Sequence, residues 1–122
     1  MSRILVIEYN SDMLQLLTNS LRGAGYQVLA VSSGEGLDIA MDAFAPHLII
    51  MDAFLPGADA LNLCRELRNR PATKTVPIII LSEQSIDSHR SVDAGADFYL
   101  EKPFTMREML AVISKSIRPE GN

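Results

Sequence analysis

The sequence has little that could crosslink the chain. Among its 122 residues there is one cysteine, Cys64. A single cysteine cannot form an internal disulfide, so we expect a reducing compartment, by default the cytoplasm. Cys64 lies beside Leu63 and Leu67 at helical spacing, which favours a small core residue over a reactive thiol.

Long apolar runs and an excess of positive charge are also missing. The longest apolar run beyond the N-terminal stretch, residues 76–81, contains a proline, and the opening MSRILVIE turns acidic after its apolar residues. We therefore expect neither a membrane span nor a signal peptide. The formal net charge of −4 argues against nucleic acid as a direct partner of this chain.

One cluster of basic side chains contrasts with this acidic background. It occupies the stretch CRELRNRPATK and contains Arg65, Arg68, Arg70 and Lys74. A solvated helix face is the favoured interpretation of such a cluster, and a docking patch for an acidic partner is the alternative.

Short apolar runs alternate with segments of helical periodicity along the chain. The apolar runs predict five strands, at residues 3–7, 26–31, 47–51, 77–81 and 98–101. The alternation predicts an α/β fold in which residues 1–122 form one domain. We expect a doubly wound, five-stranded parallel sheet that is covered on both faces through right-handed crossovers.

The segments that separate and follow the strands predict five helices. We expect Ser11 to cap the first helix and Gly23 and Gly25 to end it. The second helix should stop before Pro46, and the third should run from about residue 59 to 69. The fourth, SIDSHRSVDAG, is rich in residues that prefer turns and should be the least stable. A capping box, TMRE, begins the last.

Polar residues stand at the ends of four predicted strands: Glu8, Asp52, Ser82 and Lys102. Ligands of doubly wound sheets bind outside the carboxyl ends of the strands, so these residues should be considered together. Asp52 follows the apolar run HLIIM and should be partly desolvated, which makes Lys102 its obvious partner. A buried structural ion pair would explain the same residues and remains open.

The same strand ends carry the motifs IE, MDAFLPG, LSE and YLEKPF. In this order and spacing, over essentially the whole chain, they resemble the receiver domains of bacterial two-component response regulators. The resemblance implies a flavodoxin-like (βα)5 fold with strand order 2-1-3-4-5. It also implies a signalling module rather than an enzyme.

By this resemblance, Asp52 would accept a phosphoryl group from a sensor histidine kinase or a phosphotransfer protein. Ser82 and Lys102 would contact the phosphoryl oxygens, because phosphoryl transfer depends on positioning and on neutralising charge. Tyr99 would be the aromatic switch, and the Lys102–Pro103 bond would be cis. The signal would reach an effector or a second copy of the chain through the fourth helix, fifth strand and fifth helix.

The resemblance also implies Mg²⁺ as cofactor, held by Glu8, Asp52 and the backbone carbonyl of Phe54. Receivers usually carry two adjacent acids after the first strand, but here Tyr9 replaces the second. A neutral phenol is a poor magnesium ligand, so we expect weak binding. The missing carboxylate forfeits on the order of 8 kcal/mol of gross attraction at about 4 Å and a dielectric constant of about 20, much of it offset by ligand desolvation.

Further departures surround the predicted site. Glu83 replaces a small residue and could crowd a phosphoryl group, while Phe54 and Gln84 lie where the family tunes dephosphorylation. An apolar Phe54 could exclude attacking water. Asn10 and Asp12 could replace the missing acid, but helix capping and dipole stabilisation are favoured for them.

Three functions therefore compete. The favoured one is a phosphoacceptor receiver, and the second is a receiver-fold interaction module that works without phosphorylation. A flavodoxin-like cofactor-binding domain is disfavoured, because EYNSD presents carboxylates where a flavin phosphate needs an anion-binding nest. The sequence names neither the kinase, nor the output, nor the oligomeric state.

Overall fold

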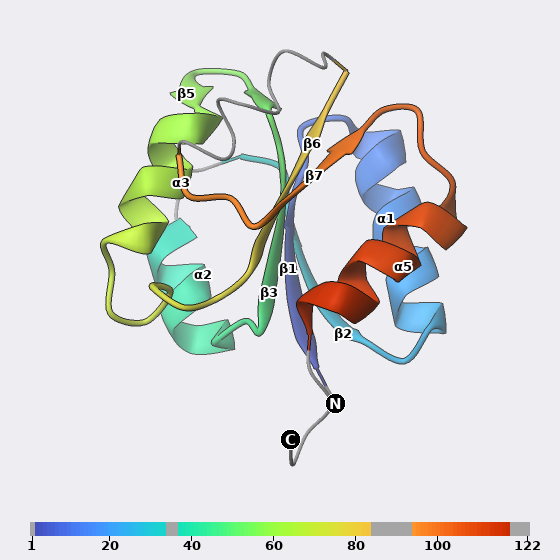
Figure 1. Cartoon of the computed structure of the whole chain (residues 1–122), viewed down its shortest axis with the longest axis horizontal. Coiled ribbons are helices and arrows are strands. Elements are labelled where there is room, and N and C mark those ends of the chain that lie inside the picture. Colours follow the sequence, from blue (N-terminus) through green and yellow to red (C-terminus); the bar gives the residue numbers. More distant parts are fainter. Residues whose placement is uncertain (1, 34–36, 84–93, 118–122) are drawn as a thin grey trace.

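The five predicted strands form one parallel sheet. The computed structural model describes residues 2–33, 37–83 and 94–117. The sheet order is β2-β1-β3-β6-β7 (Figure 1), which is the order that the resemblance implies once the strands of this sheet are counted along the chain. Its strands are β1 (Arg3–Ile7), β2 (Gln27–Val31), β3 (Leu48–Asp52), β6 (Ile78–Ser82) and β7 (Phe98–Glu101).

A short antiparallel hairpin was not predicted. Its strands, β4 (Phe54–Leu55) and β5 (Ala58–Asp59), follow β3 directly. Gly57 lies between them with φ of 76°, a conformation that glycine adopts without steric cost. The hairpin leads the chain from the carboxyl edge of the sheet into the next helix.

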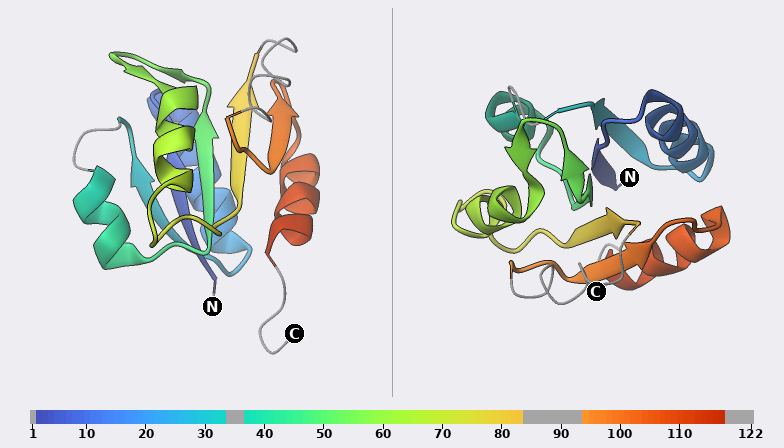
Figure 2. Two further views of the ribbon diagram at one scale, coloured as in Figure 1. Left: turned by 60° about the vertical axis from the view of Figure 1, so that its left-hand side comes forward. Right: turned by 90° about the horizontal axis from the view of Figure 1, so that it is seen from above.

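Helices cover both faces of the sheet, as the alternation predicted. Figures 1 and 2 show α1 (Ser11–Gly23) and α5 (Met106–Ser116) on one face and α2 (Leu37–Phe44) and α3 (Ala60–Arg68) on the other. The weak fourth helix predicted for residues 85–95 falls largely outside the described residues. Within the described part of the chain, none of the helices has the length and apolar character needed to cross a membrane.

Alternating strand side chains build two cores. In β1, Ile4 and Val6 pack on the side of α1 and α5, whereas Leu5 and Ile7 pack on the side of α2 and α3. All four are fully buried. Cys64 is also fully buried, on α3 in the second of these cores, which confirms that it is a core residue.

The helix starts confirm one prediction and correct another. The capping box of the last helix is present, since Glu108 N donates to Thr105 Oγ1 and Thr105 N donates to Glu108 Oε1. The cap of α1 is Asn10 and not Ser11, because Asn10 has extended backbone and its Oδ1 accepts from Met13 N at 2.9 Å. Ser11 already has helical geometry.

The interpretation of the basic stretch as a solvated face is wrong for Arg68. Arg65 is exposed, as expected, but Arg68 is only 20% exposed. Its guanidinium donates to the carbonyls of Val76 and Gly95. Spacing alone placed both arginines on the helix, but only the fold reveals that backbone carbonyls face one of them.

Candidate functional site

The polar strand ends converge on one ammonium group. Lys102 Nζ donates to Glu8 Oε1 over 3.0 Å and also contacts Asp52 Oδ2. The two acids are buried, with 1% of Glu8 and 5% of Asp52 exposed. They meet because β1, β3 and β7 are parallel and end at the same edge of the sheet. The predicted partnership of Asp52 with Lys102 is therefore present, and Glu8 belongs to it.

Backbone contacts hold Asp52 and Lys102 in place. Asp52 is the last residue of β3, and its Oδ1 accepts from Phe54 N at 2.7 Å. The amide of Lys102 donates to the carbonyl of Ser82 over 2.8 Å, which ties it to the end of β6. One oxygen of Asp52 is thus engaged by an amide and the other by an ammonium. The link from an aspartate to the amide two residues on is a common turn contact, and it could have been predicted.

Burial changes the protonation of the acid at the end of β1. Desolvation, helped by the hydrogen bond and negative charge of Asp52, raises the pKa of Glu8 to about 7, although Lys102 opposes this. Burial alone lowers the pKa of Lys102, but its hydrogen bonds to Asp52 and Glu8 raise it above the ordinary value. Near neutral pH, Glu8 therefore carries only part of its negative charge, less than the full charge that the sequence suggested.

An open cleft of about 820 Å³ lies over these residues, with apolar side chains among those that line it. Within the described residues, three large apolar side chains are exposed, namely Tyr9, Leu16 and Phe54, and all three line this cleft. The rings of Tyr9 and Phe54 meet edge to face, with centroids 6.2 Å apart. The sequence drew attention to both residues separately but gave no sign that they form a pair.

The remaining predicted residues divide between the cleft and the core. Ser82 is buried at the end of β6, and Ser82 and Glu83 both line the cleft. Tyr99 on β7 is half-buried and packs against the core that α2 and α3 cover. Gln84 lies outside the described residues.

The oxygen donors fit a magnesium ion only in part. Glu8 and Asp52 supply two carboxylates, but Lys102 already contacts both. Tyr9, at the position of the missing acid, is 57% exposed, and Asn10 is used as a helix cap. In the part of the chain that the structure describes, no cluster of three or more acidic, histidine or cysteine side chains could hold a metal.

A sequence profile of the response regulator receiver domain matches residues 4–114. The chain belongs to this family. It is a receiver domain of a two-component signalling system, as its strand-end motifs indicated. The Lys102–Pro103 bond is cis, as the resemblance implied.

A curated relative supports the same assignment for this receiver. The phosphate regulon transcriptional regulatory protein PhoB of Rhizobium meliloti is 35% identical over 118 residues, which cover 95% of this chain and 52% of the relative. The receiver therefore spans about half the length of the curated relative that it matches.

Solved structures show the same fold. The receiver domain of sensor histidine kinase PA1611 from Pseudomonas aeruginosa, which has magnesium coordinated in its active-site cleft, is 29% identical with a TM-score of 0.86, over 94% of this chain and 96% of that one. The chemotaxis response regulator CheY4 of Vibrio cholerae is 21% identical with a TM-score of 0.89, over 96% and 99% of the two chains. At that identity, CheY4 supports the fold alone.

Proposed function

We propose that this receiver domain, comprising residues 1–122, accepts a phosphoryl group on Asp52 from a histidine kinase or a phosphotransfer protein. One observation carries the proposal. Asp52 ends a buried strand beneath an open cleft, with one oxygen held by the Phe54 amide and the other beside the Lys102 ammonium. A preorganised carboxylate with a cation beside it suits a reaction in which negative charge must be neutralised.

In the proposed reaction, an oxygen of the Asp52 carboxylate forms a bond to phosphorus. The bond between phosphorus and the donor histidine nitrogen breaks, and that nitrogen leaves with the electron pair. Lys102 would transfer its contacts from Asp52 to the phosphoryl oxygens. Ser82, which lines the same cleft, would donate a further hydrogen bond to them.

The proposed signal is a rearrangement around the new phosphoryl group. Asp52 gains about one negative charge, so the residues beside it must move or provide cations. We assign the switch to Ser82 and Tyr99, because Tyr99 lies on the strand that leads to Lys102. The response would then pass through β7 and α5 to an effector or a second copy of the chain, without direct contact between this domain and nucleic acid.

Mg²⁺ is the proposed cofactor, held weakly by Glu8, Asp52 and the carbonyl of Phe54. When bound, it would neutralise charge on the phosphoryl oxygens. The metal in the related PA1611 receiver supports the location, while the phenol of Tyr9 and the hold of Lys102 on both acids argue for low affinity. The donor protein would dock on the apolar rim of Tyr9, Leu16 and Phe54, in the cytoplasm.

The second candidate is an interaction module that works without phosphorylation. Lys102 alone already bridges Glu8 and Asp52, so the pocket has less need of a cation than a site with three acids. A partner would then recognise one fixed conformation. The bridge favours this candidate, but it leaves Asp52 facing the cleft, which favours the first.

Incubation with acetyl phosphate and magnesium, followed by intact mass measurement, separates the two candidates. A phosphoryl adduct in the wild type that is lost in Asp52→Asn would support the acceptor. Asp59→Asn is the matched control, because Asp59 is an exposed aspartate that caps α3, and it should retain the adduct. Absence of an adduct under saturating donor would refute phosphorylation and support the interaction module.

A further inference from the structure

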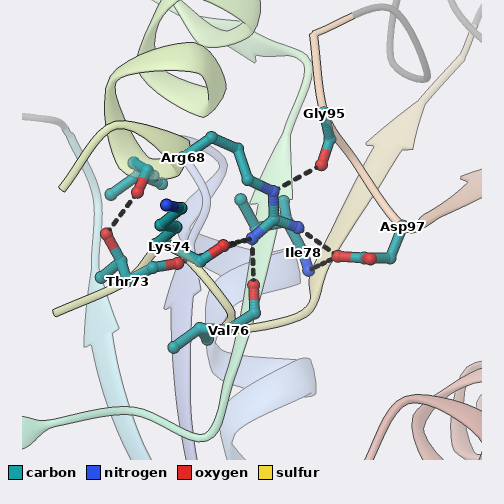
Figure 3. Close-up of polar contacts among 8 residues, drawn as sticks. Arg68, Thr73, Lys74, Val76, Ile78, Gly95 and Asp97 are labelled. Carbon is teal, nitrogen blue, oxygen red and sulfur yellow. Dashed lines mark hydrogen bonds and ion pairs between the residues drawn. The ribbon is translucent and has the colours of Figure 1, made fainter. Parts of the chain in front are cut away.

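Arg68, at the end of α3, connects three separate segments of the chain (Figure 3). Its Nε donates to the carbonyl of Gly95 at 2.7 Å. Its Nη1 donates to the carbonyls of Lys74 and Val76 at 3.2 and 2.6 Å, and its Nη2 contacts the carboxylate of Asp97. A lysine could not make these contacts together, because they require the planar, forked guanidinium.

Asp97 uses the same contact to begin the pairing of β7 with β6. Its Oδ2 accepts from Ile78 N at 2.8 Å, and its own amide donates to the carbonyl of Ile78 at 2.9 Å. Backbone and side chain of Asp97 thus both engage Ile78. Arg68 holds the carboxylate that makes the second of these contacts.

Gly95 provides the room that Arg68 needs. It has φ of +101°, and a Cβ at this position would lie 2.8 Å from Arg68 Cγ. A side chain here would therefore displace the stem of the arginine as well as strain the backbone. The backbone before β7 thus leaves space for the side chain of Arg68. An arginine that pointed into solvent would not need such space.

The register of β7 matters because the strand leads to Lys102. β7 is an edge strand of the sheet, and its residues are half-buried or exposed, so burial specifies its register less strongly than that of β3. A slip of one residue would move Lys102 by about 3.3 Å along the strand. A displacement of this size is as large as the 3.0 Å distance between Lys102 Nζ and Glu8 Oε1, so it would break that hydrogen bond.

We propose that Arg68 is a positioning residue, which with Asp97 fixes the register of β7 on β6 and thereby places the ammonium of Lys102 between Glu8 and Asp52. The contact of Asp97 with Ile78 lies at the start of β6, whereas Lys102 pairs with Ser82 at the end of that strand. Arg68 acts through β7 and does not line the cleft over Asp52. This placement concerns the unmodified chain and does not require that Asp52 be phosphorylated.

Amide hydrogen exchange and NMR shifts in Arg68→Gln test this placement. We expect exchange at Asp97 and Lys102 to accelerate by more than about tenfold relative to amides of β1 and β3, and the side-chain ammonium resonance of Lys102 to shift. Val28→Ala is the control for general destabilisation, because Val28 is buried on β2 at the opposite edge of the sheet. It should accelerate exchange without preference for β7.

Two further variants keep the test decisive should Arg68→Gln fold poorly. Asp97→Asn keeps an oxygen for Ile78 N but removes the charge that faces Arg68, and Gly95→Ala disturbs the arginine without removing a charge. Both variants should show the same faster exchange at Asp97 and Lys102 and the same shift of the Lys102 resonance. Arg68→Lys should show these changes to a smaller extent than Arg68→Gln. An unchanged Lys102 resonance with uniform acceleration of exchange in these variants would overturn the proposal.

The reaction with acetyl phosphate supplies a separate readout. If the wild type forms the adduct, Arg68→Gln should form it more slowly, and Arg65→Gln, which alters an exposed arginine of the same helix, should not. Equal rates for Arg68→Gln and the wild type would overturn the proposal. If the wild type forms no adduct, the proposed function fails, and the exchange and resonance measurements alone decide the role of Arg68.

Discussion

Lys102 and Glu8 stand 94 positions apart in the chain, yet Lys102 Nζ donates a hydrogen bond to Glu8 Oε1 over 3.0 Å. The same ammonium contacts Asp52. One ammonium group therefore forms ion pairs with two acids that come from different strands. The stability of the fold, its pH dependence and its affinity for metal should all depend on this arrangement.

Lys102→Met should destabilise the protein strongly at pH 8. The substitution leaves two buried carboxyl groups without a cation, and removing one partner of a buried ion pair costs about 3–5 kcal/mol of unfolding free energy. The loss should be smaller at pH 5, where Glu8, whose pKa is raised to about 7 in the fold, keeps its proton. Urea unfolding at both pH values measures it. Lys115→Met, on an exposed lysine of α5, is the control, and an equal loss at both pH values would contradict the explanation.

The raised pKa of Glu8 predicts that the protein becomes less stable as the pH rises from 4.5 to 7. Between these values the folded protein keeps a proton on Glu8 that the unfolded chain has released, because the pKa is about 7 in the fold against 4.5 ordinarily. The contribution of Glu8 to the free energy of unfolding is fully present below pH 4.5 and is lost as the pH rises through 7. The total loss is up to about 3 kcal/mol. Urea unfolding across this range should show the slope, and Glu8→Gln should flatten it. A slope unchanged in Glu8→Gln would assign it to another group.

Tyr9→Asp should strengthen magnesium binding. It restores a carboxylate at the rim of the cleft, and even a small part of the attraction to a divalent ion would raise affinity by about tenfold or more, since each 1.4 kcal/mol or so is a factor of ten. Calorimetric titration at pH 8, where Glu8 is mostly ionised, compares it with the wild type. Tyr9→Phe, which changes only the hydroxyl, should bind as the wild type does. Micromolar affinity in the wild type would refute the proposed weak site.

The ring of Phe54 should protect a phosphoryl group on Asp52 from water. Phe54 is 66% exposed and lines the cleft, and its ring contacts Tyr9 edge to face. In Phe54→Ala we expect a shorter lifetime of the adduct, followed by intact mass after removal of the donor. The free energy of unfolding should change little, because an aromatic pair of this kind adds only about 0.5–1.5 kcal/mol. A lifetime that stays the same in Phe54→Ala and in the double variant with Tyr9→Ala would exclude shielding.

Much of the fold followed from periodicity. Each strand of the main sheet was predicted to within one residue at either end, because the apolar runs are short and bounded by turns or helices. The strand ends then indicated which polar residues would meet, and Glu8, Asp52 and Lys102 do meet. Parallel strands make this inference strong, since their carboxyl ends must share an edge.

Other features depend on contacts that are remote in the chain. Arg68 and Arg65 look alike in the sequence, but Arg68 alone lies beside the carbonyls of Val76 and Gly95. The shift in the pKa of Glu8 depends on burial and on Asp52, which no local pattern reveals. Asn10 took the capping role expected of Ser11 because the two adjacent residues are both good caps and only the backbone decides between them.

The position of β7 at the end of the main sheet has a consequence during synthesis. β1 and β3 leave the ribosome before β7, so Glu8 and Asp52 are made well before Lys102 can reach them. Until then, burial of both acids is costly unless one keeps a proton or both stay hydrated. Lys102 follows directly after the strand that completes the edge of the sheet, so pairing of that strand and neutralisation of the two acids depend on the same late segment of the chain.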